Sequence, residues 1–317
     1  MPFEAIPSSP LTKSVSTRNA GSLMRLAAGV FRARRIIRRF APDVVVGTGG
    51  YTTAAVLLAQ RTLRGKIVIH EQNAVPGRTN LWLARIADRV CVTFDSSAVF
   101  FPAGKVATTG MPIRSEFAAV PGKAEARIAL GLSESKFTLL VGGGSQGARK
   151  LNELIINALS MFADDSTQVL HQAGERNIQE ACGLLDTLYG EDVPLEYRIE
   201  AYVDMPRAMA ASDLVVSRSG ASTIAEITAS GLPSILVPYP FAYANHQKKN
   251  AEYVVGHNAA VLCEESACTP AMVADLIATL RGSPDKLAAM ASASASLGKP
   301  DAARRVAEVV RSLAGVS

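Results

Sequence analysis

A glycine-rich loop follows an apolar run near the middle of the 317-residue chain. The run Phe137–Val141 passes directly into Gly142–Arg149, whose sequence is GGGSQGAR, and a helical pattern follows. Glycine allows positive φ and close approach of a ligand, and the first turn of a helix has free N–H groups. These features favour a phosphate-binding loop, although the G-x-G-x-x-G spacing also occurs in tight turns that bind nothing.

A nicotinamide cofactor is not expected at this loop. Such cofactors need an acidic residue about 20 positions further on, at the end of the next strand, to bind their ribose. The next apolar run ends in His171-Gln172, which carries no carboxylate. The chain also has no D-x-D sequence. We therefore expect neither a metal ion nor a cofactor.

A second turn of small residues, Arg218–Ser222, joins the apolar run Asp213–Ser217 to another helical pattern. The start of this helix is a second potential anion site. Glu226 lies about one turn into the helix, where a carboxylate suits two ribose hydroxyls better than a phosphate; the alternative is an acid favoured in the first turn by the helix dipole. Gln247 opens the next helix, and its amide suits sugar hydroxyls unless that helix start is simply solvated.

Two polar loops follow apolar runs in the first half of the chain. The run Val44–Gly47 leads into TGGY, and the run Lys66–His70 leads into EQN, which ends at Asn73. Parallel sheets bind ligands at the carboxyl ends of their strands. Because buried polar groups need partners, the HEQN run is either part of a site or a hydrogen-bonded scaffold for its loop.

Short apolar runs alternate with helical patterns over almost the whole chain, which predicts α/β structure with doubly wound parallel sheets. The expected strands are Val44–Gly47, Lys66–His70, Arg89–Thr93, Val106–Thr109, Phe137–Val141, Gln168–His171, Leu195–Ala201, Asp213–Ser217, Ser234–Val237 and Ala259–Cys263. The sequence AAVPGK at residues 118–123 interrupts the alternation. We expect two Rossmann-like domains facing a cleft: residues 1–118 with a C-terminal helix at 300–317, and residues 119–299.

The composition excludes several classes of protein. The net charge of +5 suits anionic ligands or a membrane surface, but no aromatic-rich basic module marks a nucleic-acid binder. No apolar run approaches the roughly 20 residues that cross a bilayer, and the first residues do not form a signal peptide. The four cysteines show no C-x-x-C spacing, so we expect reduced thiols in a cytosolic protein rather than disulfides or a metal site.

The segment Ala20–Phe40 is predicted to form an amphipathic helix. Its expected core face carries Leu23, Leu26, Val30, Ala33 and Ile37. The opposite face carries Arg25, Arg32, Arg35 and Arg39, with Met24 and Phe31 beside them. Basic residues mixed with exposed apolar side chains suit contact with an anionic membrane, and a solvated charged face is the alternative.

These motifs, in this order, resemble the MurG family of glycosyltransferases along essentially the whole chain from about residue 2. The resemblance is carried by GTGGY at 47–51, HEQNAVPGRTN at 70–80, TGMPIR at 109–114, GGSQGAR at 143–149, HQAG at 171–174, SRSGASTIAEITASGLPSILVP at 217–238 and NHQKKNAE at 245–252. It implies the GT-B fold and peptidoglycan synthesis at the cytoplasmic face of the membrane. The family transfers N-acetylglucosamine, with inversion, from UDP-N-acetylglucosamine to the lipid-linked acceptor undecaprenyl-pyrophosphoryl-N-acetylmuramyl-pentapeptide, which converts lipid I into lipid II.

The resemblance also implies which residues bind the donor. The UDP-sugar site is expected at Asn73, Arg114, Ser145, Val203, Ala221, Ser222, Thr223, Ile224, Ala225, Glu226 and Gln247. The phosphate loop is expected at Gly143, Gly144, Gln146 and Gly147, together with Ser145. By the resemblance, Glu226 binds the ribose, Val203 meets the uracil through its backbone, and Gln247 contacts the sugar. Arg114 offsets the charge of the leaving diphosphate.

One part of the family pattern is absent. The family begins with a strand and a GGTGGH-type loop whose histidine is the candidate general base, about 40 residues before Met1 by the resemblance. We therefore expect an incomplete first domain and assign no catalytic residue. A start site placed too far downstream, a second chain that completes the enzyme, or an inactive copy would each explain the absence. The alternative functions are binding of the UDP-sugar without turnover and transfer of another sugar to a lipid.

Overall fold

The computed structural model describes residues 3–8, 17–144 and 147–316. The chain divides into two compact units, Met1–Met111 with Asp301–Ser317, and Pro112–Pro300. The first boundary therefore lies before the expected one at residue 118. The reason is that η2 (Ser115–Ala118) packs against a helix of the second unit. Each unit has its own parallel sheet and is described by itself.

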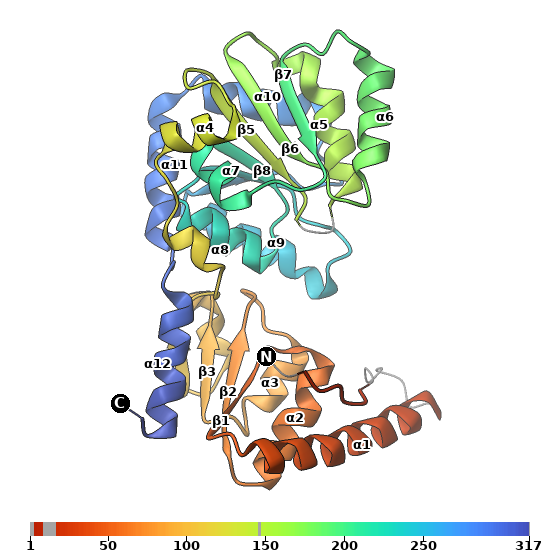
Figure 1. The fold of residues 1–317 in the computed structure, drawn as a ribbon, viewed down its shortest axis with the longest axis vertical. Coiled ribbons are helices and arrows are strands. Elements are labelled where there is room, and N and C mark those ends of the chain that lie inside the picture. The colour runs from red at the N-terminus through yellow and green to blue at the C-terminus, as the bar shows by residue number, and fades with distance from the viewer. Residues whose placement is uncertain (1–2, 9–16, 145–146, 317) are drawn as a thin grey trace. The chain divides into compact units, whose positions relative to one another are not determined.

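The described residues of the first unit form a four-stranded parallel sheet in the order β1-β2-β3-β4 (Figure 1). The strands are β1 (Val44–Gly47), β2 (Lys66–Glu71), β3 (Arg89–Val92) and β4 (Val106–Thr108). Ile67, Val68 and Ile69 are fully buried, as an apolar run covered on both faces should be. Within the described residues β1 pairs with β2 alone, and Val46 is 42% exposed, so β1 is an edge strand.

Three helices of the first unit contact its strands. They are α2 (Gly50–Thr62), α3 (Arg78–Leu83) and α12 (Ala302–Ala314), and the 3-10 helix η1 (Asp95–Phe100) follows β3. α12 is the last helix of the chain, and Ala302 at its start is fully buried. Residues at the two ends of the sequence therefore build one core.

The amphipathic helix α1 (Thr17–Phe40) packs against α2. Val30, Ala33 and Ile37 form this contact, as expected, but Leu23 is 55% exposed, so its placement in the core was wrong. α1 has 24 residues and α2 has 13, so the first turns of α1 extend beyond their packing partner. No helix in the part of the chain that the structure describes is long and apolar enough to cross a membrane.

The second unit contains a parallel sheet in the order β10-β9-β8-β5-β6-β7. Its strands are β5 (Phe137–Gly142), β6 (Thr167–Gln172), β7 (Glu196–Glu200), β8 (Leu214–Ser217), β9 (Ser234–Leu236) and β10 (Ala260–Leu262). The chain moves outward from β5 to β7, then returns to the other side of β5 and continues outward from β8 to β10. This is the doubly wound arrangement that the sequence predicts.

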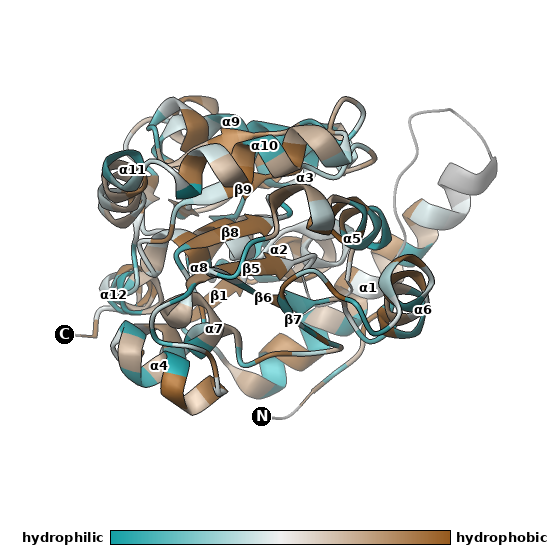
Figure 2. Cartoon of the chain, turned by 90° about the horizontal axis from the view of Figure 1, so that it is seen from above, coloured by the Kyte–Doolittle hydropathy of each residue, from teal (hydrophilic) through white to brown (hydrophobic). Residues whose placement is uncertain are grey.

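Helices cover both faces of the second sheet. They are α4 (Lys123–Leu130), α5 (Arg149–Phe162), α6 (Ile178–Tyr189), α7 (Met205–Ala211), α8 (Ala221–Ala229), α9 (His246–Gly256), α10 (Pro270–Arg281) and α11 (Pro284–Leu297), with the short η3 (Tyr243–Asn245) before α9. Leu139 and Val141 pack in one core cluster with residues of α5, α6 and α10. The alternate residue, Leu140, therefore faces the other layer. Figure 2 shows the hydrophobic strands β5 and β8 lying between these layers.

Cys263 and Cys268 form a disulfide, with their Cα atoms 5.6 Å apart. The expectation of four reduced cysteines is therefore wrong for this pair, whereas Cys91 and Cys182 are free. Cys263 follows β10, Cys268 precedes the N-cap of α10, and the turn between them brings the two together. Spacing alone does not reveal a pairing that depends on this turn.

Candidate functional site

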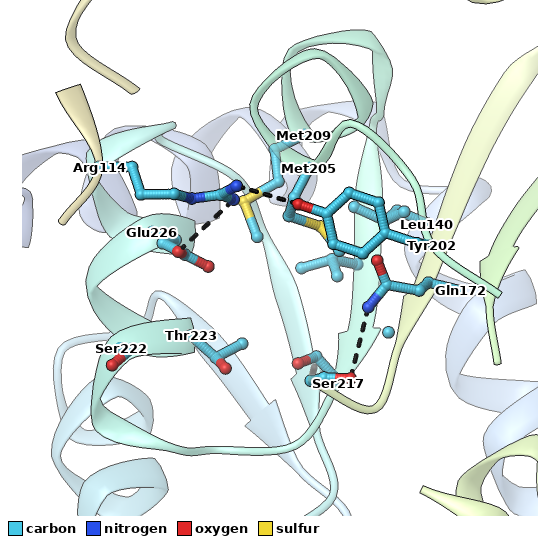
Figure 3. A pocket seen from close by; sticks show the side chains of 13 residues that line it. Arg114, Leu140, Gln172, Tyr202, Met205, Met209, Ser217, Ser222, Thr223 and Glu226 are labelled. Atoms are coloured by element: carbon cyan, nitrogen blue, oxygen red, sulfur yellow. Dashed lines mark hydrogen bonds and ion pairs between the residues drawn. The ribbon is translucent and has the colours of Figure 1, made fainter. Parts of the chain in front are cut away.

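A pocket of about 270 Å³ lies in the second unit at the carboxyl ends of β5 and β8 (Figure 3). Leu140 and Gly142 of β5 line it, opposite Val215 and Ser217 of β8, which are their partners in the sheet register. β5 and β8 are neighbours in the sheet, and the strand order reverses between them. Ligands of doubly wound sheets bind at this position, because the loops after the two strands diverge and leave a crevice.

The glycine loop after β5 has a backbone that requires glycine. Gly144 and Gly147 have φ values of +82° and +73°. A Cβ atom at Gly147 would lie 2.4 Å from the carbonyl oxygen of Ala173, and one at Gly143 would lie 2.4 Å from the backbone nitrogen of Ala148. Gly144 also lines the pocket. Because Gly144 has no side chain, the loop lets backbone atoms approach a ligand in the pocket closely.

Arg114 and Glu226 carry the charges of the pocket. α8 begins at Ala221, so Glu226 does not lie in the first turn, and the helix-dipole interpretation is wrong. The Nη2 atom of Arg114 lies 3.9 Å from Oε1 of Glu226, and Nη1 donates to the hydroxyl of Tyr202 at 3.2 Å. Burial raises the pKa of Glu226 above its usual value, and the charge of Arg114 partly offsets this shift.

The lining of the pocket is polar on some elements and apolar on others. Hydroxyls come from Ser217 at the end of β8 and from Ser222 and Thr223 in the first turn of α8. Apolar side chains come from Leu140 and Val215 of the sheet and from Met205 and Met209 of α7. An apolar wall with a few convergent polar groups is typical of sites for organic ligands.

Gln172, the last residue of β6, connects two loops at the pocket. Its Nε2 donates to the carbonyl oxygen of Gly144 at 3.3 Å, and its Oε1 accepts from the backbone N–H of Val203 at 3.1 Å. The side chain is 3% exposed and lines the pocket. One amide therefore joins the glycine loop to the segment between β7 and α7.

His171, next to Gln172, lies in a buried polar network. The Nδ2 of Asn152 donates to the carbonyl of Ala173 at 3.0 Å, so its Oδ1 faces Nε2 of His171, also at 3.0 Å. Nε2 must then carry the proton, and Nδ1 accepts from the hydroxyl of Tyr197. Complete burial lowers the pKa of His171 to about 3, so the imidazole is neutral. The network fixes the end of β6 to α5 and β7.

The residues expected on α8 divide by helical face. Ser222, Thr223 and Glu226 line the pocket. Ile224 is buried, and Ala221 and Ala225 are half-buried and do not line the pocket. The stretch 221–226 was expected as a whole, but a helix presents only some of its side chains to one site.

Val203 and Gln247 do not line the pocket. Val203 is buried, and its backbone N–H is already bound to Gln172, whereas its neighbour Tyr202 is exposed and lines the pocket. Oε1 of Gln247 accepts the backbone N–H of Tyr239 at 2.9 Å. Ser145 and Gln146, also expected in this site, lie outside the described residues.

The HEQN run belongs to the first unit and forms a hydrogen-bonded loop. The buried carboxylate of Glu71 accepts the backbone N–H groups of Asn73 at 3.0 Å and Gly77 at 3.2 Å, and the side chain of Asn80 at 2.8 Å. Nε2 of His70 lies 2.9 Å from the carbonyl oxygen of Gly110, and burial lowers its pKa. The scaffold interpretation therefore accounts for His70 and Glu71, and Asn73 is held by the same carboxylate.

Sequence reasoning missed several residues that line the pocket: Leu140, Gln172, Tyr202, Met205, Met209, Val215 and Ser217. Gln172 ends β6, while Tyr202 and Met205 follow β7. Ligands bind at the carboxyl ends of parallel strands, and this rule singled out the loops after β5 and β8. The rule applies equally to the ends of β6 and β7, so it could have identified these residues.

Known proteins match this chain over nearly all of its length. Residues 138–306 match the glycosyltransferase family 28 C-terminal domain, and residues 1–92 match the glycosyltransferase family 28 N-terminal domain. A protein of Desulforudis audaxviator is 42% identical over 99% of this chain and 85% of its own length. It is named "UDP-N-acetylglucosamine--N-acetylmuramyl-(pentapeptide) pyrophosphoryl-undecaprenol N-acetylglucosamine transferase". A Bacillus cytotoxicus protein of the same name is 38% identical over the same shares of the two chains.

A solved structure gives the same result. The crystal structure of Acinetobacter baumannii MurG matches with a TM-score of 0.77 at 28% identity, and the match covers 92% of this chain and 79% of that one. The family match to residues 138–306 alone spans more than half of the chain. From these matches and the doubly wound pocket at β5 and β8, we conclude that the chain belongs to glycosyltransferase family 28.

Proposed function

We propose that this protein transfers N-acetylglucosamine from UDP-N-acetylglucosamine to undecaprenyl-pyrophosphoryl-N-acetylmuramyl-pentapeptide, the step that converts lipid I into lipid II. The observation that carries this proposal is 42% identity, over 99% of the chain, to a relative of that name. The pocket of the second unit supports it, because a glycine loop, a helix start and a half-buried carboxylate suit a nucleoside diphosphate.

Each part of the donor has a suitable partner in the pocket. Glu226 accepts the ribose hydroxyls, because its ionised carboxylate offers two acceptor oxygens. The first-turn N–H groups of α8 and the glycine loop bind the diphosphate. The uracil packs against the apolar wall formed by Met205 and Met209, beside the exposed ring of Tyr202.

Transfer with inversion requires the acceptor hydroxyl to attack the sugar carbon on the face opposite the diphosphate. The bond between this carbon and the phosphate oxygen breaks, and its electron pair stays on UDP. Negative charge therefore grows on the diphosphate, where Arg114 and the backbone N–H groups stabilise it. A base must take the proton of the hydroxyl. We assign no residue to this role.

The test is an assay of the intact chain with radiolabelled UDP-N-acetylglucosamine and a lipid I analogue, run beside calorimetric titration with UDP. Formation of the labelled disaccharide lipid supports the proposal. Binding of UDP without transfer would instead favour a protein that holds the UDP-sugar without turnover. Transfer of a different sugar would favour a related lipid glycosyltransferase. Absence of both binding and transfer would refute the assignment.

We further propose that α1 binds an anionic membrane surface, which would place the protein at the cytoplasmic face where the lipid acceptor lies. Met24 is 69% and Phe31 78% exposed, and Arg25, Arg32 and Arg35 are exposed on the same helix. None of these three arginines forms an ion pair with a residue that the structure describes. Basic side chains around exposed apolar ones suit lipid headgroups.

A further inference from the structure

We infer that Gln172 is a positioning residue for the donor, because it holds together the two loops that flank the donor pocket. The inference rests on the proposed function, since it concerns how the same pocket binds a nucleoside diphosphate. Gln172 touches both loops with a single side chain, and its amide lies in the pocket (Figure 3). No role follows for it from the motifs of the sequence.

The chemistry of the two contacts requires an amide. The carbonyl oxygen of Gly144 needs a donor, and the backbone N–H of Val203 needs an acceptor; these contacts measure 3.3 and 3.1 Å. A glutamine supplies one of each at the end of a single side chain. A carboxylate lacks the donor and an apolar side chain lacks both. Because Gln172 is almost fully buried, either loss leaves a backbone group without water to replace the bond.

The contact to Gly144 bears on phosphate binding. The carbonyl oxygen of Gly144 also accepts the N–H of Gly147 at 2.9 Å, which closes the turn of the glycine loop. A carbonyl oxygen that faced a diphosphate would repel it. The N–H of Gly147 and the side-chain amide of Gln172 thus occupy both lone pairs of this oxygen, which weakens its repulsion of an anion in the pocket.

The contact to Val203 bears on the other end of the ligand. Tyr202 precedes Val203, and Met205 follows it; both line the pocket. Because the backbone amide of Val203 is held in place, the short segment from Tyr202 to Met205 is held as well. This segment contributes to the wall proposed to contact the uracil. The backbone of Gln172 is itself held in place, because its neighbour His171 is bonded to Asn152 and Tyr197. The side chain of Gln172 therefore extends from a backbone position that is held in place.

The chain contains a matched control on the same strand. Gln168 of β6 is fully buried and accepts the N–H of Ser133 at 2.9 Å. Its Nε2 donates to the carbonyl of Ser133 and to the hydroxyl of Thr138, both at 2.8 Å. It does not line the pocket. Gln168 and Gln172 thus lie on one strand, are both buried, and each bind a backbone N–H and a backbone carbonyl, but only Gln172 touches the loops of the site.

The experiment compares the intact wild-type chain with Gln172→Met and Gln168→Met in calorimetric titrations with UDP and with uridine. Because Gln172→Met removes both bonds that hold the loops together, it should weaken UDP binding by about tenfold, which corresponds to about 1.4 kcal/mol. The loss for uridine should be smaller, because uridine lacks the diphosphate that the glycine loop binds. Gln168→Met should lower the thermal midpoint about as much as Gln172→Met does, but it should leave UDP affinity within about twofold of wild type.

A second variant keeps the test decisive if Gln172→Met does not fold. Gln172→Asn retains the amide but is one methylene too short to reach both loops, so it should lose UDP affinity and raise the KM for the donor more than it lowers kcat. Equal UDP affinity in wild type and the foldable Gln172 variant would overturn the inference. So would equal losses in the variants of Gln172 and Gln168. Failure of the wild-type chain to bind UDP would refute the proposed function instead.

Discussion

Arg114 and Glu226 form an ion pair inside the pocket of the second unit, with Nη2 of the guanidinium 3.9 Å from Oε1 of the carboxylate. Both side chains remain partly exposed, so the pair contributes little to folding. In the proposed complex the ribose takes the carboxylate and the diphosphate takes the guanidinium. The contact between the carboxylate and the guanidinium is then replaced by two contacts to the donor. The two charges act on different parts of one ligand.

Replacing Glu226 by alanine should weaken UDP binding without harming the fold. The loss of hydrogen bonds from ribose hydroxyls to a charged acceptor is worth about 1.5–3 kcal/mol, or roughly a 10- to 150-fold rise in Kd. Glu252→Ala is the control, because Glu252 forms an ordinary exposed ion pair with Lys249 on α9. Normal UDP binding by a Glu226→Ala protein that melts early would mean that the residue serves the fold.

The affinity for uridine should rise with pH through the raised pKa of Glu226. The ionised carboxylate is the stronger acceptor, so binding strengthens as pH climbs above the ordinary value of 4.5. Because the pKa is raised in the folded state, the contribution of Glu226 to stability is lost over the same rise in pH. Calorimetry with uridine, which has no phosphate to titrate, measures the profile. A Glu226→Gln protein should give a flat one, and a parallel slope in both proteins would contradict the assignment.

The second unit should lose stability in acid because His171 is buried in its neutral form. Its pKa is about 3 in the folded protein and 6.5 ordinarily. As pH falls below 6.5, the unfolded chain gains a proton that the folded chain does not, so the free energy of unfolding decreases. The decrease continues until the pH reaches the pKa of His171 in the folded protein. The slope approaches about 1.4 kcal/mol per pH unit for one proton. Urea unfolding between these pH values should show a shallower slope for His171→Gln than for the wild-type chain.

Breaking the disulfide should lower the stability of the second unit moderately. Cys263 and Cys268 are five residues apart, and a loop of this size is worth about 2 kcal/mol in the chain-entropy account. Unfolding of Cys268→Ser by guanidinium, without reductant, measures the change. Cys182→Ser removes a free thiol and should leave the midpoint nearly unchanged. If added dithiothreitol leaves the wild-type midpoint where it was, the pair makes no such contribution.

Reversing charge on α1 should release the protein from anionic vesicles. Each of Arg32 and Arg35 is expected to contribute about 1 kcal/mol near such a surface, and added salt should weaken the association. The double variant Arg32→Glu/Arg35→Glu is compared by flotation with Arg61→Glu/Arg85→Glu, which changes the net charge equally at exposed positions outside α1. Equal binding by both variants would remove the membrane role from this helix.

The strands were predictable from the sequence because their signal is local. Runs such as Lys66–His70 and Phe137–Val141 are apolar and bounded by glycine or polar residues, and the observed strands differ from them by a residue or two. Leu23 was misplaced because periodicity identifies a helix face but not where its packing partner ends. The disulfide was missed for a related reason, since it depends on the turn between β10 and α10.

The site was predictable as a set of loops, but not as a set of side chains. Gly144, Ser222, Thr223 and Glu226, which were expected in the donor site, line the pocket, and their contact with a donor stays a prediction. Gln172 was not identified, because its importance comes from reaching two loops that are distant in the sequence. Such a bridge is a property of the tertiary structure, and no spacing along the chain encodes it.

The last helix of the chain places a constraint on the order in which the protein can fold during synthesis. α12 packs on β1 and β2, whose residues leave the ribosome more than 200 positions earlier. The second unit is continuous in the sequence and can complete its core as soon as it emerges. The first unit must wait with part of its sheet uncovered until α12 has emerged. A chain that stops before Ala302 would therefore damage the unit that was made first, and leave the later one intact.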